Sequence, residues 1–132
     1  NVVEEPCHHG FTISKERKKL MKLIEAIIRP EKLEPLKDAF LEAKVNGMNV
    51  RQILGCGNQF GWVAHNRGTS VMMNMLPKIE IKVVVADDKV EEIVQLIMDT
   101  VRTGEIGDGK IFIKPVEECI RIRTGERGDM AL

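Results

Sequence analysis

The order in which hydrophobic periodicity changes along the chain constrains its fold more than any other feature. Short β-branched runs alternate with stretches whose apolar residues recur at helical spacing, and each pattern predicts its own secondary structure. The expected elements are strands at 22–29, 48–54, 78–85 and 110–114, a short fifth strand at 119–123, and helices at about 32–44 and 89–102. The order βαββαβ is the ferredoxin-like split motif. We therefore expect one α+β ferredoxin-like sandwich.

Local signals set the expected ends of these elements. Pro30 and Pro115 are expected to stop the first and fourth strands, because proline has no N–H to donate to a sheet. Pro35 is compatible with a helix only in its first turn. Asp88, followed by Glu91 three residues later, predicts a capped start for the second helix.

Length and composition exclude several classes of protein. The chain has 132 residues, enough for one domain, and its 20 basic residues balance 20 acidic ones. It therefore lacks the electrostatic field that draws a protein to nucleic acid or to an anionic membrane. Aromatic residues make up 4% of the chain and Tyr is absent, which leaves little for base stacking. We expect no nucleic-acid partner, and membrane contact only through another protein.

Cysteine usage and hydropathy favour a cytoplasmic protein. Cys7, Cys56 and Cys119 are odd in number and form no CxxC pair, which suits a reducing compartment. Cys56 and Cys119 are expected to be small buried residues. No apolar run approaches the roughly 20 residues that span a bilayer, and the acidic start lacks the positive region of a secretory signal.

Two segments fall outside the periodic pattern. Residues 1–20 are expected to be a flexible N-terminal extension of a domain at 21–132. The Cys7-His8-His9 cluster within it is weak evidence for a metal site, because no second pair of ligands follows. Residues 57–76 are too long for a hairpin turn, and a connection of this length in a compact domain is usually functional or disordered.

The segment GEIGDGK at 104–110 superficially satisfies the phosphate-loop pattern of Walker NTPases. Ile111 stands where that pattern needs Ser or Thr, and a strand rather than a helix follows, so a Walker site is not expected. Two interpretations remain. The segment is either an ordinary helix-to-strand turn, or a turn whose backbone amides approach an anion with Lys110 as a point charge beside them.

Arg121 and Arg123 are two residues apart in the predicted fifth strand, so their side chains are expected on one face. Two guanidinium groups on one face suit a phosphate chain. Alternating Arg and Ile is also usual for a solvated edge strand, so both interpretations stay open.

Four stretches resemble the PII family of nitrogen-regulatory signal transducers. TGEIGDGKIF at 103–112 and RIRTGERG at 121–128 look like its two C-terminal signatures, MKLIEAIIRP at 21–30 resembles its N-terminus, and GCGNQ at 55–59 would enter its long T-loop. The resemblance covers 112 residues (132 − 20). It implies a homotrimer assembled around its sheets. Such a protein binds ATP or ADP and 2-oxoglutarate, and regulates a target through a T-loop at about 57–76.

The resemblance also implies which residues form the sites. The expected nucleotide-binding residues are Gly47, Met48, Gly55, Cys56, Gly57, Asn58, Gln59, Val84, Gly107, Asp108, Gly109, Lys110, Arg121 and Arg123, the last two reaching in from a neighbouring subunit. The expected 2-oxoglutarate-binding residues are Arg29, Gly57, Gln59, Gly61 and Lys78. Gln59 would complete a Mg²⁺ shell shared with the ATP phosphates. Partner contact is expected from Trp62 and from Arg67-Gly68, the loop-tip pair that plugs an ammonium channel.

Several positions depart from the family pattern. Asn58 and Phe60 stand where many members have Arg and Lys, so phosphate contact and effector affinity are expected to be weaker. Val71 stands where enterobacterial members carry the uridylylated tyrosine, and without any Tyr that modification is chemically impossible. Thr69 and Ser70 are candidate phosphorylation sites, as in cyanobacterial members.

Three classes of function remain open from the sequence. The first is a non-enzymatic sensor whose target is an ammonium transporter or a nitrogen-assimilation enzyme. The second is a small ferredoxin-like enzyme of the nucleotide-hydrolysing or acylphosphatase-like kind, although no Ser-His-Asp, Cys-His or paired-carboxylate arrangement supports it. The third is a trimeric scaffold that has lost its ligands, which the residues at 58 and 60 keep open.

Overall fold

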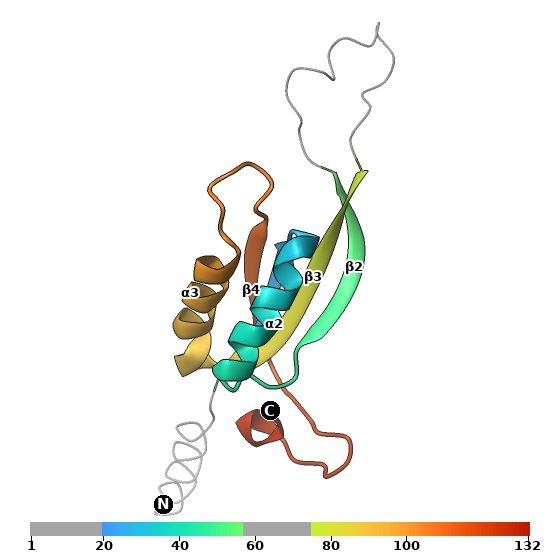
Figure 1. Cartoon of the computed structure of the whole chain (residues 1–132). Helices are drawn as coiled ribbons and strands as arrows, with labels where there is room; N and C mark the ends of the chain where they lie inside the picture. The colour runs from blue at the N-terminus through green and yellow to red at the C-terminus, as the bar shows by residue number, and fades with distance from the viewer. Residues whose placement is uncertain (1–19, 57–74) are drawn as a thin grey trace, which may run out of the picture.

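The computed structural model describes residues 20–56 and 75–132 (Figure 1). Its elements are β1 (Met21–Ile28), η1 (Pro30–Lys32), α2 (Leu33–Glu42), β2 (Asn49–Cys56), β3 (Met75–Ala86), η3 (Asp87–Lys89), α3 (Val90–Val101), β4 (Lys110–Val116) and η4 (Gly128–Ala131), where η denotes a 3-10 helix. The strands and α-helices follow the βαββαβ order, which confirms the predicted ferredoxin-like fold. In these two ranges no helix has both the length and the apolar character needed to cross a bilayer.

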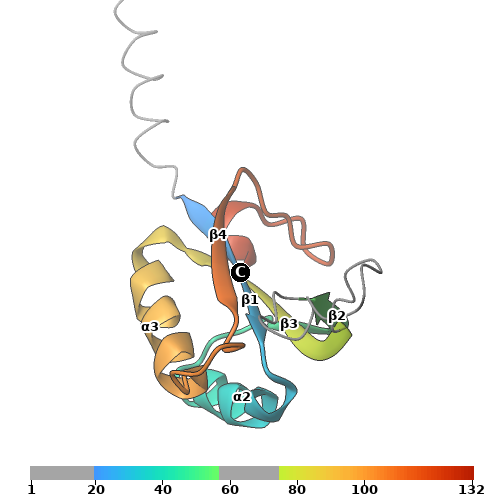
Figure 2. The same cartoon turned by 90° about the horizontal axis from the view of Figure 1, so that it is seen from above.

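The four strands form one antiparallel sheet in the order β2-β3-β1-β4, with β1 and β3 in the middle. Both α-helices lie on the same face of this sheet (Figures 1 and 2). Side chains of β1 alternate in direction, so Ile24, Ala26 and Ile28 point to the helices and are at most 1% exposed. They pack in one core with residues of α2 and α3, among them Phe40 and Ile97. Burying each large side chain stabilises the fold by about 1.5–3 kcal/mol.

Among the described residues, no α-helix lies over the other face of the sheet. Alternate β1 side chains reach this face, and among them Glu25 forms ion pairs with Lys114 at 3.0 Å and with Lys82 at 3.5 Å. The hydrogen bond from Lys114 is the main reason that the pKa of Glu25 lies below its ordinary value, and Lys82 contributes in the same direction. This uncovered face is therefore charged along its middle, on β1, β3 and β4 together.

Element boundaries differ from the sequence-based expectations where 3-10 turns and edge positions intervene. Asp88 lies inside η3, so α3 begins after Lys89 without a side-chain cap, and the backbone N–H of Val90 bonds to the carbonyl of Asp87 instead. β4 continues through Pro115 to Val116. Proline is tolerated there because β4 is an edge strand, paired only with β1.

A shorter helix and a longer strand complete these corrections. α2 spans ten residues and ends before Lys44, which has a left-handed φ of 60°. Pro35 is its third residue, which confirms the expected place in the first turn. β3 begins at Met75, so the last two residues of the predicted loop at 57–76 pair with β2 instead.

Cys56 is exposed and Cys119 half-buried, so the expectation that both are buried was wrong.

The predicted fifth strand at 119–123 is wrong. The chain forms only an isolated bridge between Ile120 and Arg127, and residues 122–124 form a turn. Gly125 and Gly128 have φ angles of 76° and 73°, which lets the chain reverse before a ladder develops. Arg121 and Arg123 therefore do not share the face of a strand.

Candidate anion-binding site

The glycine-rich turn between α3 and β4 packs directly on the backbone of β1. Gly104, Gly107 and Gly109 have φ angles of 90°, 104° and 108°, a region that other residues rarely adopt. A Cβ atom at Gly109 would lie 1.7 Å from the carbonyl oxygen of Ile27, and one at Gly107 would lie 3.2 Å from the Arg29 guanidinium. Glycine is thus required at Gly109 by its conformation and by its contact with β1.

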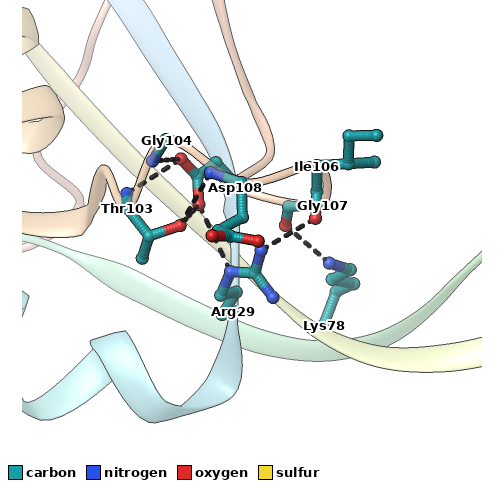
Figure 3. A network of polar contacts seen from close by, with 8 residues as sticks. Arg29, Lys78, Thr103, Gly104, Ile106, Gly107 and Asp108 are labelled. Carbon is teal, nitrogen blue, oxygen red and sulfur yellow. Dashed lines mark hydrogen bonds and ion pairs between the residues drawn. The ribbon is translucent and has the colours of Figure 1, made fainter.

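Asp108 closes this turn on itself (Figure 3). Its carboxylate accepts hydrogen bonds from the backbone N–H groups of Thr103 and Gly104, both at 2.8 Å, and from the Thr103 hydroxyl. The Nε of Arg29 donates to it from 3.3 Å. The Thr103 hydroxyl bond is the largest reason that the pKa of Asp108 lies far below its ordinary value of 3.8. Within the chain, this carboxylate therefore holds the shape of the turn.

Two cations hold the outer part of the turn. Arg29, just after β1, donates from Nη2 to the carbonyl of Ile106 at 2.9 Å, and Lys78, on β3, donates to the carbonyl of Gly107 at 2.9 Å. Sequence reasoning had placed Arg29 and Lys78 together as carboxylate-binding residues, and the structure brings both to the same turn (Figure 3). Sequence reasoning did not predict the contact of Thr103 with Asp108. The available signal was a hydroxyl residue five positions before an aspartate, with two glycines between them.

These residues border a hollow of about 400 Å³ at the end of β2 and β3 where the described chain breaks off. It is lined by Ile27, Arg29, Gly55, Cys56, Leu76, Lys78, Ile106, Gly107, Gly109 and Lys110. Of the described residues that line it, three are cations and none carries a carboxylate. The Lys110 ammonium forms no hydrogen bond or ion pair with the described part of the chain. The hollow is therefore suited to an anion.

The structure does not bring the remaining predicted residues to this hollow. Val84 lies six residues beyond Lys78 on β3, on the order of 20 Å away along an extended strand. Arg121 and Arg123 belong to the C-terminal segment, which lies at the opposite end of the sheet from the α3–β4 turn (Figure 1). Val84 borders a second hollow, of about 210 Å³, together with Leu132 and residues 43–46.

Gly47 and Met48 lie in the connection between α2 and β2. Met48 packs partly against the core, and Gly47 has a φ of 77°. Seven predicted binding or partner residues fall outside the described residues: Gly57, Asn58, Gln59 (also the proposed Mg²⁺ ligand), Gly61, Trp62, Arg67 and Gly68. The same holds for Phe60, Thr69, Ser70 and Val71.

The fold and this turn define a class of protein, namely small ferredoxin-like domains with a cationic hollow at a glycine-rich α-to-β turn. Comparison with known proteins gives the particular family. The sequence profile described as Nitrogen regulatory protein P-II matches residues 21–126. The chain belongs to the nitrogen regulatory protein P-II family.

Relatives support this membership over nearly their whole length. The chain is 51% identical over 112 residues to a Nitrogen regulatory protein P-II from Cereibacter sphaeroides, covering 85% of this chain and all of that one. It is 48% identical to Nitrogen regulatory protein P-II 2 from Methanothermobacter thermautotrophicus, covering 85% and 97%.

Solved structures agree with the fold. The B. subtilis GlnK–ATP complex aligns with a TM-score of 0.74 at 30% identity, covering 87% of this chain and 98% of that one. Arabidopsis thaliana PII bound to citrate aligns with a TM-score of 0.70 at 35% identity, covering 87% and 94%.

Proposed function

We propose that this chain is a cytoplasmic, non-enzymatic sensor of nitrogen, carbon and energy status that binds ATP or ADP together with 2-oxoglutarate. The three cations around the hollow support an anionic ligand, and Asp108 fixes the shape of the α3–β4 turn that forms one wall of it. The relatives from B. subtilis and A. thaliana are described as complexes with ATP and with citrate, both of which are anions.

The observation that carries the proposal is the separation of two residue groups within one chain. The turn with Lys110 lies at one end of the sheet, and Val84, Arg121 and Arg123 lie at the other. One chain therefore supplies two different halves of a nucleotide site. A neighbouring copy would supply the complementary half. We propose that three copies close into a homotrimer with three such sites between subunits, as family membership suggests.

The uncovered face of the sheet supports the same assembly. By strand register, Leu23, Ile27, Val84 and Phe112 reach this face, and Phe112 is 44% exposed. Neighbouring sheets in the trimer would cover these apolar side chains, which a single chain leaves open to water.

The 2-oxoglutarate subsite rests on Arg29 and Lys78. Lys78 and the Nη2 of Arg29 donate to neutral carbonyl oxygens of the turn, while the Nε of Arg29 is paired with the Asp108 carboxylate. A carboxylate is a stronger acceptor for each of them, since charge-assisted hydrogen bonds are roughly twice as strong as neutral ones.

Mg²⁺ would fit this arrangement only if ATP and 2-oxoglutarate supplied most of its oxygen ligands. No three His, Cys, Asp or Glu side chains of the described residues lie close enough to hold a metal ion. Oxygens of ATP and 2-oxoglutarate, with Gln59, would complete the shell, and the ion would neutralise the charge that the two ligands bring together.

The proposed output is a target protein, either an ammonium transporter or a nitrogen-assimilation enzyme, contacted through Trp62 and Arg67-Gly68. These residues lie outside the described ranges, and the assignment rests on family membership. Arg67→Ala is expected to abolish co-sedimentation with channel-containing membranes while leaving nucleotide binding unchanged. Undiminished co-sedimentation of this variant would assign the target to the other class.

Light scattering and isothermal titration test the proposal together. We expect a trimer that binds ATP, and 2-oxoglutarate binding only when ATP and Mg²⁺ are present. A monomer with full nucleotide affinity would contradict the shared site. Equal 2-oxoglutarate binding in ADP or in chelator would contradict the ligand-completed Mg²⁺ shell, and rapid phosphate release by substoichiometric protein would favour an enzyme.

A further inference from the structure

The guanidinium of Arg121 is already occupied by the C-terminal residues of its own chain. Its Nη2 donates to the main-chain oxygens of Leu132 at 2.9 Å and of Ala131 at 3.3 Å. Its Nη1 lies 3.4 Å from the Glu126 carboxylate. The chain reverses after Arg121 and returns through η4, which brings its last residues back over this side chain.

These contacts use the nitrogen that phosphate recognition needs most. A guanidinium binds an oxyanion with two parallel hydrogen bonds either through Nη1 and Nη2 or through Nε and Nη2. Both arrangements require Nη2, and in Arg121 this nitrogen already donates to two main-chain oxygens. Nη1 in addition lies beside a carboxylate. Arg121 in this state can offer an anion single, weaker contacts only.

Arg123 provides an internal contrast. It lies in the exposed turn at 122–124, and within the described residues its guanidinium makes no hydrogen bond or ion pair. Of the two arginines assigned to the nucleotide phosphates, one is therefore free to bind and the other is held by its own chain.

We propose that the C-terminal segment at 128–132 competes with nucleotide phosphates for Arg121, so that a nucleotide must displace this segment to bind with full affinity. The inference rests on the proposed function, in which Arg121 reaches the phosphates held by a neighbouring subunit. Binding then has two consequences: its affinity is reduced by the fraction of Arg121 that is occupied, and the bound state releases the C-terminal residues. Nucleotide occupancy is thereby reported at the end of the chain.

Deleting residues 129–132 tests the competition, because the two contacts are to backbone oxygens that no side-chain change removes. Isothermal titration with ATP is expected to show an affinity raised roughly tenfold, the scale of one charged hydrogen bond. Met130→Ser, at a side chain that is 69% exposed, is the matched control and keeps both carbonyls. It is expected to bind ATP as the full chain does.

Carboxypeptidase digestion of the 132-residue chain gives a second readout that needs no deletion. ATP is expected to accelerate the release of Leu132, and in Arg121→Ala the release is expected to be fast with or without ATP. Slower release with ATP, or an affinity that the deletion leaves unchanged or weakens, would overturn the competition alone. Absence of ATP binding in both the full-length and shortened chains would overturn the proposed function and the competition with it.

Discussion

At the scale of single residues, the candidate site depends on positions where no other side chain fits. Gly109 combines a left-handed φ with the close approach of the Ile27 carbonyl, whereas Gly104 has a left-handed φ but open space around it. Gly104→Ala is expected to lower the free energy of unfolding by about 1–2 kcal/mol from backbone strain. Gly109→Ala adds a clash with the Ile27 carbonyl. It is expected to lower the free energy of unfolding further than Gly104→Ala does, and to weaken ATP binding. Urea unfolding and ATP titration compare the two, and equal losses would contradict the close-contact account.

Asp108 has a pH signature of its own. Its folded-state pKa lies far below the ordinary value of 3.8, first because of the Thr103 hydroxyl bond. Its contribution to stability is thus fully present above pH 3.8 and is lost as the pH falls through the lowered pKa. Asp108→Asn is expected to lower stability at pH 7 and to flatten the loss of stability below pH 3.8. Unfolding measured from pH 2 to 7 checks this, and parallel wild-type and variant profiles would contradict it.

At the scale of elements, local sequence patterns predicted which helices and strands exist better than they predicted where each one begins and ends. Strict alternation in β3 and the apolar stripe of α3 are properties of single segments, so the sequence alone revealed both. Pro115 was misread because the edge position of β4 is a property of the whole sheet. Alternation of Arg and Ile at 120–123 matches the sequence pattern of a strand. Gly125, however, lets the chain turn before it can pair with a partner strand.

In the candidate site too, the sequence predicted some features and missed others. Motif residues such as Lys110 and Lys78 were recognised because their pattern is local or familial, and the hollow unites them. The Asp108–Thr103 closure and the C-terminal contacts of Arg121 were missed, because both depend on how a turn folds back in three dimensions.

The charged cluster on the uncovered sheet face belongs to this scale too. Glu25→Gln would leave Lys82 and Lys114 without their shared counter-charge. Because the pKa of Glu25 is lowered, its stabilising effect is present above its ordinary value of 4.5 and disappears as the pH falls through the lowered pKa. We expect the variant to be less stable than wild type at pH 7, with the difference vanishing in strong acid.

Glu34→Gln is the control for this cluster. Glu34 pairs with Lys37 one helical turn away and its side chain is 74% exposed, so its loss is expected to change stability by less than about 0.5 kcal/mol. Urea unfolding at pH 7 and at pH 2 compares both variants with wild type. A Glu25→Gln effect no larger than that of Glu34→Gln would show that the cluster is solvated and without influence on stability.

At the scale of the whole molecule, each subunit of the proposed trimer carries an incomplete nucleotide site. The turn with Lys110 and the segment with Arg121 lie at opposite ends of one sheet (Figure 1), and in the proposed trimer a neighbouring copy would bring the two into one site. In that trimer, nucleotide binding would act directly on the contact between copies. The proposed assembly would also account for a single chain that has a cationic hollow but no complete nucleotide pocket.

Mixing two half-site variants tests this claim most directly. Lys110→Ala and Arg121→Ala trimers are each expected to bind ATP poorly, because every site lacks one half. After the two are unfolded together and refolded as an equal mixture, random assembly restores both halves in about a quarter of the sites. Isothermal titration of the mixture should therefore recover high-affinity ATP binding at roughly a quarter of the wild-type stoichiometry. Confirmed subunit exchange with no recovered binding would contradict a site shared between subunits.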